Sequence, residues 1–174
     1  MAEVSAVGTE VRTRVEALFR ALNEHDLDKL IELHTVDALW DDPELAEPVR
    51  GRAAIAVRAA AMFRAFPDLQ FMLDEMEIYL ADSGRVAARW HAVGTMTGPI
   101  EPPGFGPTGK KASFSGVCFY EFEDGLFARH TILYDSMGLL RQVGVMPMPE
   151  SPQAKLMAGL QRAVARAGRP PRRR

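Results

Sequence analysis

The stretch ASFSGVCFYEFEDGLFARHTILY, residues 112–134, contains two extended runs separated by Glu123-Asp124-Gly125. Aromatic and β-branched residues are frequent in both runs, and Asp-Gly is a preferred turn between antiparallel strands. We therefore predict a β-hairpin with strands at Ala112–Phe122 and Leu126–Tyr134.

Two more extended runs precede this hairpin. We predict strands at Gln70–Leu80 and Arg85–Met96, joined by a second hairpin-like turn at Asp82-Ser83-Gly84. The segment Thr97–Lys110 is rich in proline and glycine and is too long for a tight turn. Loops of this length in compact domains are often lids or subunit contacts.

Helical periodicity replaces the strand pattern before Pro67 and after Ser151. We predict helices at Thr9–Glu24, after the capping residue Asp26, at Gly51–Phe66 and at Pro152–Ala167. Three helices followed by four strands joined by hairpins favour an α+β fold. In this fold a curved antiparallel sheet is wrapped by the N-terminal helices around a pocket.

The length and composition are those of one globular domain. The chain has 174 residues, of which 47% are hydrophobic and 25% charged. No run approaches the roughly 18 apolar residues of a membrane span. The N-terminus lacks the features of a signal peptide, and the single Cys118 excludes an internal disulfide framework. We expect one cytoplasmic domain over residues 1–174, with a core at about 9–146, a C-terminal helix at 152–167 and a basic tail at 168–174.

The charges are unevenly distributed along the chain. Residues 162–174 contain six arginines and no acidic residue, so residues 1–161 have 15 basic and 23 acidic residues, a net charge of −8. An acidic body argues against nucleic-acid binding, because neutralising phosphates needs a positive face. We interpret the basic tail as a solvated chain end.

Metal and cofactor sites are not indicated by the sequence. His25, His34, His91 and His130 have no paired ligand spacing, and there is no CxxC motif. The glycines of Gly104-Phe-Gly106 lie in a proline-rich loop with no helix after it, unlike a phosphate-binding loop. We expect no metal, no other cofactor, and helix-surface positions for His25 and His34.

Several short motifs resemble one superfamily when taken in order. Ala21–Leu30, Trp40-Asp-Asp-Pro43 and Gly51–Ile55 are similar to the N-terminal half of nuclear transport factor 2-like proteins, which include ketosteroid isomerase and the SnoaL-like polyketide cyclases. The motifs that resemble the SnoaL-like branch are Phe66-Pro-Asp68, Arg89-Trp90, Gly94–Gly98, Pro107–Lys110, Phe114–Gly116, Tyr134-Asp135 and Gly138–Gly144.

The resemblance covers about residues 10–145 and implies a cone-shaped α+β fold with an antiparallel or mixed sheet around a pocket. It also implies dimers that pair through the sheet. It leaves the reaction open, because this fold carries isomerases, cyclases, epoxide hydrolases, dehydratases and inactive binding modules.

Asp42 is the first candidate catalytic residue. It precedes Pro43 and follows an apolar extended segment that would bring it to the rim of the pocket. The resemblance places it at the position of the general base in ketosteroid isomerase. A carboxylate that faces an apolar pocket is suited to taking a proton beside a carbonyl. The alternative is a purely structural Asx-type turn with Pro43.

Arg89 and His91 are two further catalytic candidates, because alternate residues of a strand share a face. If that face is inward, the two side chains could polarise a carbonyl or stabilise an enolate. The inward orientation is favoured by a resemblance to limonene epoxide hydrolase, in which an arginine and an acid have this spacing. His91 replaces the acid, which argues against the same hydrolysis. The alternative is an exposed pair with Trp90 in the core.

His130 is the fourth catalytic candidate and shares a strand face with Ile132 and Tyr134. In alignment with SnoaL-like cyclases, Ile132 occupies the place of the acid/base aspartate. Asp135 has the opposite parity, and we expect a structural role for it at the strand end. Leu18 occupies the place of the oxyanion tyrosine of ketosteroid isomerase.

The expected substrate contacts come from the same helices and strands. They are Trp40, Leu18, Met62, Phe63, Cys118, Tyr120, Ile132 and Tyr134. Cys118 is expected to be a buried, unreactive thiol.

The sequence favours a cofactor-free cyclase or isomerase that uses acid/base chemistry on a polyketide-like or other apolar carbonyl compound, in natural-product biosynthesis. Loss of the cyclase acid and of the oxyanion tyrosine favours a non-catalytic protein that binds a hydrophobic metabolite. An epoxide hydrolase or dehydratase-like enzyme is the third interpretation. We expect an apolar small-molecule partner and a homodimer, and neither nucleic-acid nor membrane partners.

Overall fold

The computed structural model describes residues 2–73, 76–80 and 85–167. Its helices are α1 (Ala2–Glu24), α2 (Leu27–Glu32), α3 (Arg52–Ala65), α4 (Ser136–Gln142) and α5 (Pro152–Ala167). Its strands are β1 (His34–Asp41), β2 (Val49–Arg50), β3 (Gln70–Phe71), β4 (Glu77–Leu80), β5 (Arg85–Thr95), β6 (Lys111–Glu123) and β7 (Leu126–Tyr134).

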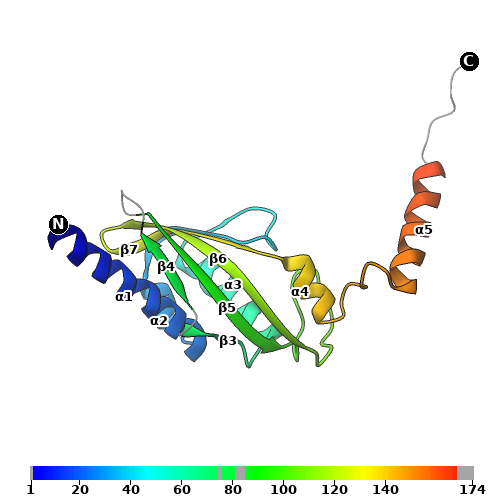
Figure 1. Ribbon diagram of the computed structural model, residues 1–174, viewed down its shortest axis with the longest axis horizontal. Coiled ribbons are helices and arrows are strands. Elements are labelled where there is room, and N and C mark those ends of the chain that lie inside the picture. Colours follow the sequence, from blue (N-terminus) through cyan, green and yellow to red (C-terminus); the bar gives the residue numbers. More distant parts are fainter. Residues whose placement is uncertain (1, 74–75, 81–84, 168–174) are drawn as a thin grey trace, which may run out of the picture.

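The strands form one curled, mixed sheet with the order β2-β1-β7-β6-β5-β3, and β4 also pairs with β5. β1 and β7 are parallel, whereas the other neighbours are antiparallel. Figure 1 shows α1, α2 and α3 on one side of this sheet. The predicted α+β cone with N-terminal helices around a curved sheet is confirmed.

The hairpin of β6 and β7 is built as its sequence predicts. Asp124 and Gly125 both have positive φ, 50° and 74°, the backbone that matches the twist of a two-residue hairpin turn. β6 pairs along its length with β7 on one side and β5 on the other. These three long strands form the curved wall against which the helices pack.

The core lies between the helices and the inner face of the sheet. In β5 every second residue is buried, including Val86, Ala88 and Trp90, as expected for a strand with one face inward. The inner faces of α1 and α3 cover this side with fully buried residues such as Leu18 and Ile55.

Asn23 connects the end of α1 to the sheet edge at β3. Its Nδ2 donates to the Phe71 carbonyl oxygen over 2.9 Å, and its Oδ1 accepts from the Phe71 N–H over 2.8 Å. The side chain therefore replaces a missing neighbouring strand at this point, because it satisfies both backbone groups of Phe71.

The strand predicted at Gln70–Leu80 and the helix-surface positions predicted for His25 and His34 need correction, whereas one predicted turn is not tested. The single strand expected at Gln70–Leu80 is two short strands, β3 and β4, that pair with different parts of β5. The turn expected at Asp82-Ser83-Gly84 lies outside the described residues. His34 is not on a helix surface but is fully buried at the start of β1. His25 lies in the turn after α1 and stacks on Phe63 with ring centroids 4.2 Å apart.

The C-terminal helix is present, but it stands apart from the body of the molecule (Figure 1). Its apolar residues Leu156, Leu160 and Val164 are 60–73% exposed. Their helical spacing therefore correctly predicted a helix, but in this chain no described element covers the stripe.

The outer face of the sheet exposes Phe119 and Leu133, which are 47% and 51% accessible. Apolar side chains side by side on an exposed surface are typical of an interface. The homodimer stays a prediction, and the mass of the protein in solution tests it.

Candidate functional site

A largely apolar pocket lies between the helices and the inner face of the sheet. It is lined by Phe19, Leu22, Trp40, Asp42, Glu44, Arg58, Ala59, Ala61, Met62, Ala65, Phe66, Leu69, Phe71, Trp90, Ile100, Glu101, Phe114, Cys118, His130, Ile132, Tyr134 and Leu139. Ile100 and Glu101 come from the loop Thr97–Lys110, so that loop covers part of the pocket. The carboxylates of Asp42 and Glu44 and the guanidinium of Arg58 lie together in this wall.

Asp42 stands directly after β1, where the chain turns at Pro43. Its Oδ1 accepts from the Glu44 backbone N–H over 2.9 Å. The Asx-type turn that was considered as the structural alternative is therefore present. The same turn leaves the Asp42 carboxylate in the pocket wall. A structural role in the turn is therefore compatible with a place in the functional site.

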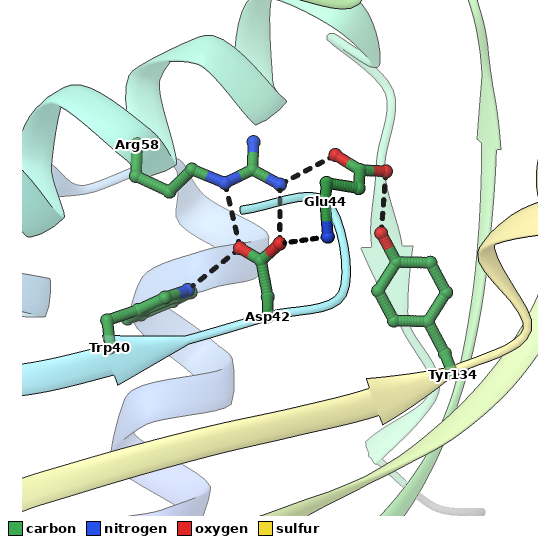
Figure 2. Close-up of polar contacts among 5 residues, drawn as sticks. All are labelled: Trp40, Asp42, Glu44, Arg58 and Tyr134. Atoms are coloured by element: carbon green, nitrogen blue, oxygen red, sulfur yellow. Dashed lines mark hydrogen bonds and ion pairs between the residues drawn. The ribbon is translucent and has the colours of Figure 1, made fainter. Parts of the chain in front are cut away.

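Arg58 on α3 holds both carboxylates. Its Nε donates to Asp42 Oδ2 over 2.8 Å, and its Nη2 donates to Asp42 Oδ1 over 3.2 Å and to Glu44 Oε2 over 2.7 Å (Figure 2). Burial alone would lower the pKa of Arg58, but the bonds and charges of the two carboxylates outweigh it and raise the pKa above its ordinary value. The guanidinium is permanently charged.

Asp42 is saturated with hydrogen-bond donors. Besides the two bonds from Arg58 and the Glu44 N–H, its Oδ2 accepts from Trp40 Nε1 over 3.2 Å. Its side chain is only 3% exposed. In this arrangement the Asp42 carboxylate holds Arg58 in place and accepts four hydrogen bonds from protein donors.

Glu44 is the more accessible carboxylate, with a side chain 24% exposed. Its Oε1 accepts from the Tyr134 hydroxyl over 2.6 Å, and this bond joins the loop after β1 to the end of β7 (Figure 2). Burial, followed by the charge of Glu44, raises the pKa of Tyr134 well above its ordinary value. The phenol is therefore protonated and acts as a hydrogen-bond donor.

The comparisons with known proteins agree with this architecture. The family described as SnoaL-like polyketide cyclase matches residues 9–143 of the chain. The chain belongs to the SnoaL-like polyketide cyclase family. No curated protein matches the sequence.

Solved structures resemble the chain over most of its length. AclR of Streptomyces galilaeus, a proposed hydroxylase, is 27% identical with a TM-score of 0.67, over 90% of this chain and 94% of AclR. TsrD of Streptomyces laurentii is 26% identical with a TM-score of 0.68, over 79% and 97% of the two chains. A proposed SnoaL-like polyketide cyclase from Jannaschia sp. CCS1 is 19% identical with a TM-score of 0.70, over 80% and 94%.

Arg89 and His91 do not face the pocket of this SnoaL-like protein, so their expected inward orientation is wrong. Arg89 Nη1 lies 3.4 Å from Glu77 Oε2 on the outer face of the sheet, and its side chain is 64% exposed. The His91 ring bonds to the hydroxyls of two outer-face serines over 3.0 and 3.1 Å. Trp90 takes the inward position, because neighbouring residues of a strand point to opposite faces.

His130 lies in the pocket wall and is 1% exposed. Its ring centroid is 4.2 Å from that of Trp40, and its Nε2 is 3.3 Å from Cys118 Sγ. Burial and the nearby His34 lower its pKa well below the ordinary value. His130 is therefore a neutral imidazole rather than a cation.

The expected substrate contacts divide into two groups. Those that line the pocket are Trp40, Met62, Cys118, Ile132 and Tyr134, whereas Leu18, Phe63 and Tyr120 are buried behind its wall. Phe19 lines the pocket instead of Leu18, since one residue along a helix rotates the side chain by about 100°. Burial raises the pKa of Cys118 to about 12, which is consistent with an unreactive thiol.

Asp135 has the structural role expected for it. Its side chain accepts from the Gly138 N–H over 2.7 Å and caps α4. The cap satisfies one of the free N–H groups at the start of this helix.

Within the hydrogen-bonded network of the pocket wall, Glu44 and Arg58 are the residues that the sequence interpretation missed. Arg58 lies three residues after Ile55 and four before Met62, so it interrupts the buried stripe of α3. A charged residue within an apolar stripe indicates a buried partner, because an unpaired charge is not tolerated there. Glu44 had no comparable indication beyond its position two residues after Asp42.

No group of metal-ligating side chains is present in the part of the chain that the structure describes. Within the same residues, no helix is both long and apolar enough to cross a membrane.

Because His34 is buried, we expect the stability of the protein to depend on pH. Burial lowers its pKa to about 4, from an ordinary value of 6.5, although its bond to the Leu30 carbonyl opposes the shift. Below pH 6.5 His34 takes up a proton in the unfolded chain but stays neutral in the folded chain. The free energy of unfolding therefore falls as the pH falls. We expect the free energy of unfolding to drop by about 2 kcal/mol between about pH 7 and pH 5 through this group.

Urea unfolding at several pH values measures this effect. His34→Gln is expected to remove about this much of the pH dependence, whereas His91→Gln, on the outer face, leaves it in place. If the free energy of unfolding changed equally with pH in His34→Gln and in the unsubstituted protein, this would contradict the assignment of the pH dependence to His34.

Proposed function

We propose that this member of the SnoaL-like family is a cofactor-free cyclase or isomerase that works by acid/base chemistry on an apolar, carbonyl-bearing small molecule. The observation that carries the proposal is the hydrogen-bonded pair of Glu44 and Tyr134, held by Arg58 in the wall of a largely apolar pocket. Apolar walls with a few placed polar groups are typical of small-molecule sites.

Glu44 is the proposed base. It is more exposed than Asp42, and among the described residues its carboxylate accepts from two donors, Arg58 and Tyr134. A proton removed from the carbon beside the carbonyl would pass to Glu44, and the same carboxylic acid would return it at another carbon or after ring closure. The proton count of the enzyme is thus restored at the end of the reaction.

Tyr134 is the proposed donor to the oxygen that becomes negative. Its phenol is protonated and donates a hydrogen bond to Glu44. A substrate carbonyl oxygen could replace Glu44 as the acceptor of this hydrogen bond. Arg58 offsets part of the negative charge of the two carboxylates, and Asp42 keeps Arg58 in place. This assignment differs from the expectation drawn from the sequence, in which Asp42 takes the proton and Arg89, His91 and His130 stabilise or reprotonate the oxyanion.

Exchange of α-hydrogens tests the proton-transfer step without knowledge of the natural substrate. 2-Tetralone, an apolar ketone, would be incubated with the protein in deuterium oxide and followed by NMR. Glu44→Gln keeps the size of the side chain and is expected to lower the catalysed exchange rate by about 100-fold or more. Glu47→Gln, an exposed residue of the same loop, is the matched control and should leave the rate unchanged.

An exchange rate that is equal in Glu44→Gln and the unsubstituted protein would remove Glu44 as the base. Tyr134→Phe should also slow exchange, because the enolate loses its donor. Product analysis with natural-product ketones and epoxides then separates cyclisation and isomerisation from epoxide opening, dehydration or the hydroxylation suggested by the name of AclR.

Binding without turnover is the second candidate function. It is favoured by the saturation of Asp42 and by the donors already bound to both oxygens of Glu44. A protein that binds 2-tetralone but does not accelerate its exchange would support this candidate.

A further inference from the structure

The C-terminal helix α5 carries an apolar stripe that no other described element covers. The stripe consists of Leu156, Leu160 and Val164, which recur every fourth residue and therefore share one side of the helix. Met157 lies beside the stripe and is 50% exposed. Helices of about this length are marginal in water on their own, and in proteins most of their stability comes from packing an apolar face. The stripe therefore indicates a surface that binds to α5.

The segment before α5 holds the helix away from its own body. The N–H groups of Val145 and Met146 both donate to the Leu140 carbonyl oxygen, over 2.9 and 3.0 Å, so the chain is fixed to α4 as far as Met146. Three of the next six residues, 147–152, are prolines. Proline-rich segments are extended and act as semi-rigid spacers. This spacer favours a partner outside the same molecule, in agreement with the position of α5 in Figure 1.

The start of α5 is well defined. The Ser151 hydroxyl oxygen accepts from the Ala154 N–H over 3.2 Å, and Pro152 is the first residue of the helix. Serine is a preferred capping residue, and proline is favoured at the first helical position. A capped helix directly after a spacer is typical of a structured arm and not of a frayed chain end.

The C-terminal segment and the rest of the chain have opposite charge. Residues 151–174 contain seven basic and no acidic residues, whereas residues 1–150 contain 14 basic and 23 acidic residues, a net charge of −9. Opposite charges on two surfaces steer their encounter and favour their association. The basic segment of one copy is therefore attracted to the acidic body of another copy.

The arginines of α5 lie opposite its apolar stripe. Arg162 follows Leu160 by two residues and Arg166 follows Val164 by two, so each arginine is about 200° around the helix from that neighbour. The guanidinium groups therefore stay in water when the stripe is covered, and their charge is not buried. A protein surface suits this arrangement. An anionic lipid surface suits it less, because it repels the acidic body and would contact the side of α5 without arginines.

A second exposed apolar surface is the outer patch, formed by Tyr79 on β4, Phe119 on β6 and Leu133 on β7. Ala87 of β5 pairs with Tyr79 on one side and with Phe119 on the other, so its small side chain leaves a shallow hollow between them. Two strand spacings separate Tyr79 from Phe119, about 10 Å, and the stripe of α5 is about 12 Å long. The stripe and the outer patch therefore match in length as well as in character.

The charged residues beside the outer patch already have partners. Arg85 Nε and Arg129 Nε lie 3.6 and 4.0 Å from the Glu121 carboxylate oxygens, and Arg89 Nη1 lies 3.4 Å from Glu77 Oε2. Because the arginines of α5 point away from its stripe, a docked helix does not bring them against these pairs. The apolar surfaces can therefore meet without a new contact between like charges.

We propose that α5 is an exchange arm: its apolar stripe docks on the outer patch of a second copy of the chain, and the α5 of that copy docks in return. The reciprocal contacts close a two-fold dimer, because each copy offers one arm and one patch. The family resemblance implied pairing of sheet against sheet, whereas here a helix covers the sheet of the partner. This inference is independent of the proposed function, since the pocket lies on the inner face of the sheet.

Analytical ultracentrifugation of the full chain at micromolar concentration tests the arm. Leu156→Glu combined with Leu160→Glu puts two charges into the stripe and is expected to raise the dissociation constant of the dimer by about 100-fold or more. Ala158→Glu combined with Ala165→Glu is the matched control. It adds the same charge on another side of the helix and should raise the dissociation constant by no more than about fivefold.

A variant of the outer patch tests the other half of the contact. Phe119→Ser removes the ring from the exposed side of β6 and is expected to weaken the dimer by about 10-fold or more. Circular dichroism checks that each variant is folded. If a variant does not fold, a mixed sample of two otherwise unsubstituted copies decides the matter.

In the mixed sample one copy carries ¹⁵N and the other carries a nitroxide spin label at Ala158→Cys. Cys118 is buried and stays unlabelled. We expect the label to broaden the amide resonances of Tyr79, Ala87 and Phe119 in the ¹⁵N copy. Only an α5 from another molecule can produce this broadening, because the ¹⁵N copy carries no label.

Three results would overturn the proposal. Unchanged dimer affinity in Leu156→Glu with Leu160→Glu would mean that the sheets pair without α5. A mixed sample without broadening at the outer patch would place α5 elsewhere on the partner. A monomeric unsubstituted protein would leave the stripe to its own body or to a different partner, and sedimentation with vesicles of phosphatidylcholine and phosphatidylglycerol would then assign it to lipid.

Discussion

Arg58→Met is expected to lower the free energy of unfolding by about 3–5 kcal/mol, because it leaves buried carboxylate charge without its partner. The Asp42 side chain is 3% exposed and the Arg58 side chain 14%, so little water can replace the guanidinium. Methionine preserves much of the apolar stem. Guanidinium chloride unfolding at neutral pH measures the loss, with the slope of the transition compared between variants.

Two controls separate the ion pair from general damage to α3. Arg64→Met removes an arginine of the same helix that is 57% exposed, and it should change stability by no more than about 0.5 kcal/mol. Combining Arg58→Met with Asp42→Asn and Glu44→Gln removes the carboxylate charges as well and should recover most of the loss. A loss of under about 1 kcal/mol in Arg58→Met alone would contradict a buried, tightly coupled network.

Gly98→Ala is expected to destabilise the protein by about 3 kcal/mol or more, because the added methyl group has no space. A Cβ at this position would overlap the Arg64 carbonyl oxygen and lie 2.7 Å from the Arg64 carbonyl carbon. Both are backbone atoms at the end of α3, so no side-chain rotation can relieve the overlap. The Gly98 N–H also donates to the Ala65 carbonyl oxygen over 3.2 Å, and this bond would be lost with the displacement.

The same substitution elsewhere in this loop provides the control. Gly106→Ala introduces a methyl group with no atom within 4 Å and should be close to neutral. Since the loop carries Ile100 into the pocket wall, Gly98→Ala should also weaken binding of apolar ketones such as 2-tetralone. Equal melting temperatures for Gly98→Ala and Gly106→Ala would contradict the close approach of the loop to α3.

Much of the fold followed from local patterns. The Asp124-Gly125 turn predicted the β6–β7 hairpin, and alternating burial in β5 matched a strand with one face in the core. The strand at Gln70–Leu80 was mispredicted because two short strands separated by a few residues have the same composition as one long strand.

The candidate site was predicted less completely than the fold. Asp42 and His130 were named from the sequence and line the pocket, whereas Arg89 and His91 lie on the outer face. Alternation along a strand shows which residues share a face, but not which face is turned to the helices.

Local sequence was sufficient for features that arise between near neighbours: the turns, the helix periods and the pairing of long strands through a short loop. The hydrogen-bonded network in the pocket wall joins residues that are distant in sequence. Arg58 is 16 residues from Asp42, and Tyr134 is 90 residues from Glu44. Their meeting is set by how α3 and the end of β7 pack around the loop after β1. The folded chain alone brings these groups together, because hydrogen bonds and charge pairing act over a few ångströms in space, irrespective of separation along the chain.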